Sequence, residues 1–143
     1  MKMMFVILFA FSMIAFANPS EKLLDAISIV ESHKNDHAVN VPERAVGRFQ
    51  IRPQYLKEVN RILKMNNKSG YEYHDRLDST KSREMVKIYL VFWGNQYKKA
   101  TGKNPTDEVY AKIHNGHAFW KKNSPNYQAK IDTYWGKVKK NMR

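Results

Sequence analysis

The sequence is poor in cysteine, in acidic residues and in the features that divide a chain into domains. It has no Cys, and 13 Asp and Glu residues stand against 25 Lys and Arg residues in a chain of 143. Without cysteine, neither disulfides nor the lipid anchor of a lipoprotein can form, so packing alone must hold the fold. No internal repeat, low-complexity segment or long linker interrupts the chain. We therefore expect one domain.

Long apolar runs are also absent beyond the amino-terminal residues. The run Met3–Phe16 is shorter than the roughly 20 residues that a membrane-spanning helix needs. Ala15 and Ala17 stand at the two small positions that signal peptidase recognises, which predicts a signal peptide over residues 1–17 and a mature domain over residues 18–143. The alternative is a retained membrane anchor. We expect a secreted or periplasmic protein with no integral membrane segment after cleavage.

The excess of basic residues gives the chain a formal net charge of +12. Such a field favours polyanionic partners, of which anionic cell wall, nucleic acid and acidic membrane are the candidates. The Lys and Arg residues are scattered, with no recognition-helix or zinc-finger pattern, so we expect no specific nucleic acid. The same charge also fits an ordinary solvated surface.

Apolar residues recur at helical spacing in five segments joined by polar loops. The segments cover about residues 21–32, 53–65, 79–101, 107–114 and 125–140. Ser20, Thr106 and Ser124 stand where helix N-caps are expected. Residues 46–51 mix apolar and polar side chains, which predicts a short extended segment. The expected fold class is mainly α with at most a small β element.

Glu31 lies at the carboxyl end of the first predicted helix, on the same face as Leu24 and Ile27. Partial burial and the negative end of the helix dipole both favour the protonated carboxyl there. A carboxyl that keeps its proton near neutral pH is what a glycosidase needs to protonate a leaving glycosidic oxygen. The alternative is that Glu31 only flanks the apolar stripe and reaches water.

Four short motifs follow one another along the chain. They are Ile29–Ser32, Ala45–Ile51 followed by Pro53, Ile113–Gly116, and Thr133–Tyr134 followed by Val138. In this order and spacing the chain resembles the soluble-type lytic transglycosylases of the lysozyme-like superfamily, which also includes the goose-type lysozymes. The resemblance covers nearly all of residues 18–143 and implies a lysozyme-like single domain.

The resemblance implies cleavage of the β-1,4 bond between N-acetylmuramic acid and N-acetylglucosamine in peptidoglycan glycan strands. The single catalytic Glu of the family falls on Glu31, and the Ser beside it, which orients the carboxylate or the substrate, falls on Ser32. The family's Gly-Leu-Met-Gln motif falls on residues 47–50. Gly47 is therefore expected to allow close backbone approach, and Gln50 to hydrogen-bond the substrate.

The remaining substrate-binding residues implied by the resemblance come late in the chain. The family's Ala-Tyr-Asn falls on residues 113–115, which include His114 and Asn115. Its late Tyr, which hydrogen-bonds near the catalytic carboxylate, falls on Tyr134. We expect the glycan to cross a cleft between the first helix, residues 47–50 and a loop that carries Asn115.

Several residues depart from the family pattern or have ordinary structural readings. Arg48 stands where an apolar residue is usual, which predicts an altered glycan or stem-peptide contact, and His114 replaces the middle Tyr together with its stacking ring. Gln50 and Asn115 are also common turn and cap residues. Tyr134 also stands at core spacing on the last predicted helix.

The outcome of the reaction depends on whether a second carboxylate assists water. Because the resemblance supplies one catalytic acid, we predict a lytic transglycosylase that forms 1,6-anhydromuramoyl products. The alternatives are a hydrolytic lysozyme in which Asp36 or Glu43 assists water, and a non-catalytic cationic protein that binds the cell envelope. We expect peptidoglycan as the partner, neither cofactor nor metal ion, and a monomer.

Overall fold

The structure is a computed structural model that describes residues 18–116 and 124–143. The predicted signal peptide lies outside the described residues. Helices dominate the described chain and the only sheet in that part has two strands, which confirms the mainly α class with a small β element. The elements are α1 (Glu21–Ser32), β1 (Val39–Asn40), β2 (Ala45–Val46), α2 (Pro53–Met65), the 3₁₀ helix η1 (Tyr73–Leu77), α3 (Ser79–Thr101), α4 (Asp107–Gly116) and α5 (Pro125–Lys140).

The predicted N-caps are present at the starts of three helices. The Ser20 hydroxyl accepts a hydrogen bond from the Leu23 amide at 3.1 Å, and Ser124 and Thr106 accept equivalent bonds at 3.3 Å. Such bonds satisfy amide groups that have no partner inside the first turn. The helix starts predicted from these capping residues are therefore confirmed.

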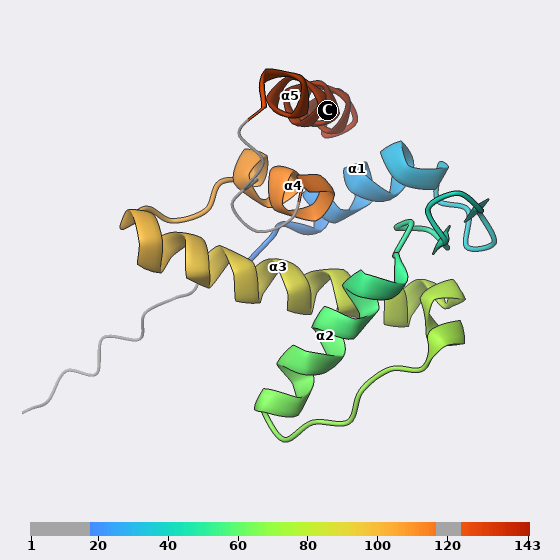
Figure 1. The fold of residues 1–143 in the computed structure, drawn as a ribbon. Helices are drawn as coiled ribbons and strands as arrows, with labels where there is room; N and C mark the ends of the chain where they lie inside the picture. The colour runs from blue at the N-terminus through green and yellow to red at the C-terminus, as the bar shows by residue number, and fades with distance from the viewer. Residues whose placement is uncertain (1–17, 117–123) are drawn as a thin grey trace, which may run out of the picture.

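The helices pack in a continuous series around α3. In Figure 1, α3 runs across the middle, with α2 on one side and α4 on the other. α5 packs on α4, and α1 contacts both α4 and α5. The β1–β2 hairpin lies just beyond the carboxyl end of α1 (Figure 1). The end of α1, the hairpin and α4 therefore converge on one side of the molecule.

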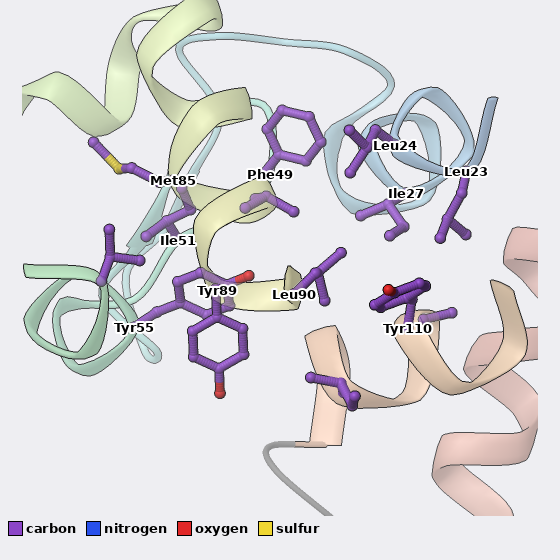
Figure 2. Packing of buried hydrophobic residues seen from close by; sticks show 14 of the residues in the cluster. Leu23, Leu24, Ile27, Phe49, Ile51, Tyr55, Met85, Tyr89, Leu90 and Tyr110 are labelled. Atoms are coloured by element: carbon purple, nitrogen blue, oxygen red, sulfur yellow. The ribbon is translucent and has the colours of Figure 1, made fainter. Parts of the chain in front are cut away.

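One hydrophobic core joins all five helices. In Figure 2, Ile27 of α1 points toward Leu90 of α3, while Leu24 of α1 points toward Phe49, which packs beside α3 from the segment after the hairpin. Leu24, Ile27, Phe49 and Leu90 are fully buried. Burial of this kind, at about 1.5–3 kcal/mol for each large apolar side chain, stabilises a fold that has no disulfide.

The prediction of an extended segment over residues 46–51 is wrong for residues 47–50. Val46 and Ile51 pair as an isolated antiparallel bridge, and residues 47–50 form a tight turn between them. The reversal depends on left-handed backbone at both ends of the turn, with φ of 79° at Gly47 and 50° at Gln50. Alternating polarity alone does not reveal such a turn, because it depends on backbone angles rather than on side-chain period.

Arg76 of η1 is the main polar anchor of this turn. Its guanidinium is buried and donates to the carbonyl oxygens of Ile51 at 2.7 Å and Arg44 at 3.2 Å. It also stacks over the Tyr73 ring, with its central carbon 3.8 Å from the ring centroid. Five donors in a rigid plane allow one side chain to hold several carbonyls at once. η1 therefore fixes the segment that leads into α2.

None of the helices in residues 18–116 and 124–143 is long and apolar enough to cross a membrane. The longest, α3, has 23 residues, but it carries Lys81, Arg83, Glu84 and Lys87 in its first half.

Candidate active site

A polar pocket opens where the end of α1, the hairpin, the start of α2 and α4 meet. Its lining residues are Glu31, Asn40, Glu43, Ala45, Gln50, Arg52, Gln54, Tyr55, His114 and Asn115. Four of the predicted site residues, Glu31, Gln50, His114 and Asn115, thus share one pocket although they come from different parts of the chain.

Glu31 lies in the wall of this pocket with only 18% of its side chain exposed. The Tyr134 hydroxyl, from α5, donates a hydrogen bond of 2.7 Å to Glu31 Oε1. The structure therefore places Tyr134 against the carboxyl, as the resemblance implied for the late Tyr of the family.

Two buried tyrosines near Glu31 stay in the neutral form. Burial raises the pKa of the Tyr134 hydroxyl well above its usual range, and the charge of Glu31 and the hydrogen bond to it raise that pKa further. Burial likewise raises the pKa of Tyr55, with smaller effects from Tyr89 and Glu31. Tyr134 is therefore a permanent hydrogen-bond donor to Glu31 at physiological pH.

His114 bridges Tyr55 and the carboxyl. Its Nδ1 is 3.1 Å from the Tyr55 hydroxyl oxygen, and its Nε2 is 3.5 Å from Glu31 Oε1. When Tyr55 donates to Nδ1, the tautomer that satisfies both contacts carries its hydrogen on Nε2, facing Glu31. The Tyr55 ring stacks on Tyr89 with centroids 3.9 Å apart. These contacts fix His114 as part of the wall.

Ser32 and Gly47 are not among the lining residues and instead shape the turn behind the pocket. The Ser32 hydroxyl donates to the Arg48 carbonyl oxygen at 2.8 Å and accepts from the Asn35 amide at 3.0 Å. Gly47 is buried, and a Cβ there would lie 2.2 Å from the Arg76 carbonyl oxygen. The close backbone approach that Gly47 allows is therefore that of η1.

Gln50 and Asn115 reach the pocket from a turn and from a helix. The Gln50 amide nitrogen donates to the carbonyl oxygens of Gly47 at 3.0 Å and Ala38 at 3.3 Å, so the amide oxygen is the polar atom left for a ligand. Asn115 was expected on a loop, which is wrong: it lies inside α4, which continues to Gly116. Gly116, without a Cβ, lets the end of α4 pack closely on Ile131 of α5.

The two candidate second carboxylates occupy different positions. Asp36 accepts hydrogen bonds from Arg48 Nε at 2.9 Å and Nη2 at 3.1 Å and is not among the lining residues of the pocket. Arg48, expected to contact glycan or stem peptide, thus has its guanidinium bound to Asp36. Glu43 lines the pocket and forms an ion pair with Arg52, which also lines it.

Sequence reasoning missed several polar lining residues, namely Asn40, Arg52, Gln54 and Tyr55. Tyr55 stood at core spacing in the second predicted helix, and it is indeed part of the core cluster. The other three carry no spacing signal, since they reach the pocket through the fold of the hairpin and the angle of α2. Only a three-dimensional arrangement identifies them.

In the part of the chain that the structure describes, no group of three or more His, Asp or Glu side chains could hold a metal ion. No family model, curated protein or solved structure matches this chain. The resemblance to lytic transglycosylases therefore stays a prediction.

Proposed function

We propose that this protein cleaves the β-1,4 bond between N-acetylmuramic acid and N-acetylglucosamine in peptidoglycan, with Glu31 as general acid. The observation that carries the proposal is a largely buried carboxyl in a polar pocket, held by a neutral tyrosine. The carboxyl is 18% exposed and accepts the Tyr134 hydrogen bond at 2.7 Å. Such a group can hold a proton in a fixed direction toward a bound glycosidic oxygen.

The contacts of Glu31 support different tasks for its two carboxyl oxygens. Among the described residues, both Tyr134 and His114 face Oε1. Oε2 is then the oxygen that carries the proton and delivers it to the bridging oxygen. Cleavage of the bond between that oxygen and the muramoyl C1 releases the 4-hydroxyl of N-acetylglucosamine and leaves Glu31 ionised.

In the transglycosylase outcome, ionised Glu31 removes the proton from the muramoyl 6-hydroxyl. The O6 atom then bonds to C1 and closes a 1,6-anhydro ring. Glu31 is protonated again at the end of the cycle, and no water is consumed. Tyr134 and the Nε2 hydrogen of His114 stabilise the carboxylate between the two proton transfers.

Hydrolysis is the second candidate, and one observation favours it. Glu43 lines the same pocket as Glu31, and its ion pair with Arg52 fixes its side chain at the pocket wall. A carboxylate on the opposite side of the glycosidic bond could activate water, as the base of an inverting glycosidase does. Asp36 is the weaker partner, because it is bound to Arg48 outside the lining of the pocket.

Substitution of the acid tests the proposal. Glu31→Gln keeps the shape of the side chain and removes its transferable proton, so the release of fragments from purified peptidoglycan should fall by at least about 100-fold. The melting temperature should not fall, and Glu43→Gln provides the matched carboxyl-to-amide control for folding. Activity of Glu31→Gln within tenfold of the parent would mean that another group is the acid. Undiminished clearing of walls would favour a non-catalytic cationic binder.

Digestion in oxygen-18 water distinguishes the two outcomes. We predict 1,6-anhydromuramoyl ends that carry no label, detected as products one water lighter by mass spectrometry, and a rate for Glu43→Gln within a few-fold of the parent. Label in new reducing muramoyl ends, together with a large loss of rate in Glu43→Gln, would instead establish a hydrolase that uses Glu43 to activate water.

A further inference from the structure

A second hollow adjoins the Glu31 pocket along α5. Its lining residues are Asn115, Asn126, Ala129, Lys130, Thr133, Tyr134 and Lys137. Asn115 lines both hollows. Tyr134 lines the second hollow, and its hydroxyl donates a hydrogen bond to Glu31. A polymer bound at Glu31 could therefore extend from one hollow into the other.

The hollow is formed by one stripe of α5. Asn126, Lys130, Thr133 and Lys137 are spaced by four, three and four residues, which places them on one helix face. All four are exposed, whereas Ile131, Tyr134 and Val138 of the same helix are buried. α5 thus packs its apolar face on α1 and α4 and presents a polar, cationic face beside the site.

The two lysines of this stripe are available for an anion. In residues 18–116 and 124–143, the carboxylate of α5, Asp132, pairs with Lys112 of α4 at 2.8 Å, and neither Lys130 nor Lys137 forms an ion pair. Their positions differ by seven residues, which corresponds to roughly 10 Å along the helix axis. A ligand that contacts both must carry two negative groups about that far apart.

We propose that this hollow is a subsite for the acidic peptide that substitutes the muramoyl residue, with Lys130 and Lys137 binding its carboxylates. The inference rests on the proposed function, since it assumes that a glycan strand occupies the Glu31 pocket. The uncharged rings of the glycan give no reason for a cationic wall, whereas its lactyl-linked peptide carries several carboxylates. Two carboxylates three residues apart on an extended peptide span roughly 10 Å, which matches the spacing of the lysines.

Glycan strands with and without peptides test this subsite. One substrate is soluble, teichoic-acid-free strands that keep their peptides. The other is the same strands after amidase treatment, which hydrolyses the lactyl amide, removes all the peptide carboxylates and leaves one lactyl carboxylate on each muramoyl residue. Lys130→Gln/Lys137→Gln should raise the KM roughly tenfold on peptide-bearing strands, because two exposed ion pairs are lost, and leave the KM on stripped strands unchanged. The value of kcat should change little on either substrate.

Lys139→Gln/Lys140→Gln is the matched control. Both residues are exposed on α5, the variant loses the same charge, and neither residue lines the hollow. It should leave the KM on both substrates near the parent value. An equal rise in KM in the two double variants would show that only the overall positive charge matters. An equal rise in KM on the two substrates would show that the lysines contact the glycan rather than the peptide. Either result overturns the subsite. A parent protein that cleaves neither substrate would overturn the proposed function itself.

Discussion

At the residue scale, Tyr134 belongs both to the hydrophobic core and to the candidate site. Its ring belongs to the core cluster, while its hydroxyl donates to Glu31 across a separation of 103 residues in the chain. Burial keeps the hydroxyl neutral by raising its pKa, so the hydroxyl retains the proton that it donates to the carboxyl. The same burial that stabilises α5 therefore holds the Tyr134 hydroxyl against the Glu31 carboxyl.

Tyr134→Phe should remove this orientation while keeping the ring in the core. A hydrogen bond to a charged group is worth about 1.5–3 kcal/mol, which corresponds to roughly a 10- to 100-fold loss of kcat, with little change in KM. Steady-state kinetics on soluble glycan strands provide the measurement. Tyr127→Phe is the control, since the Tyr127 hydroxyl donates to the Gly116 carbonyl on the same helix pair. A kcat for Tyr134→Phe within twofold of the parent would show that Glu31 needs no such donor.

At the element scale, the hairpin and its turn are held against η1 by contacts that only a glycine permits. Gly47 has φ of 79°, and its amide donates to the Ala38 carbonyl oxygen at 2.8 Å. On its open side lies the backbone of Arg76, whose side chain in turn binds the Ile51 carbonyl oxygen. The pocket wall formed by Asn40, Glu43 and Gln50 thus depends on this packing.

Gly47→Ala should destabilise the protein by at least about 2 kcal/mol, because a left-handed φ and a backbone clash both oppose a Cβ there. Gly102→Ala measures the cost of the left-handed φ alone, since Gly102 has φ of 73° but no atom within 4 Å of the point where a Cβ would lie. Gly136→Ala, in α5 with open space around it, should be neutral or stabilise by about 1 kcal/mol. Urea unfolding midpoints measure the series. A Gly47→Ala protein no less stable than Gly102→Ala would contradict the close packing of the turn on η1.

At the scale of the whole molecule, acidic residues are used largely to join elements, which leaves cations in excess on the surface. Arg83 of α3 binds Asp25 of α1 at 2.9 Å and also pairs with Glu21, and Lys112 of α4 joins Asp132 of α5. With a formal net charge of +12, the chain has an electrostatic field that favours polyanions over a longer range than any single contact. The cationic face of α5 is where that field adjoins the candidate site.

The helices and their starts could be predicted from the amino-acid sequence. Helix formation depends on spacing and capping within a few residues, so the stripes of α1, α2 and α5 and caps such as Ser20 and Ser124 could be recognised without a fold. The sequence also singled out Glu31, through its place on the apolar face of the first predicted helix together with the resemblance of the motifs around it to a known family. The helices and their caps depend on residues close in sequence, so they form in the folded chain where the sequence predicts them.

The surroundings of Glu31 could not be predicted in this way, because they depend on tertiary structure. The hydrogen bond from Tyr134, the bridge from Tyr55 through His114, and the lining by Arg52 join positions far apart in the chain. The reversal at residues 47–50 differs from the expected extended segment because left-handed backbone angles leave no mark in the polarity pattern. Such contacts follow from how α4, α5 and the hairpin pack together, and packing is set by the whole core rather than by the spacing of residues within any one segment.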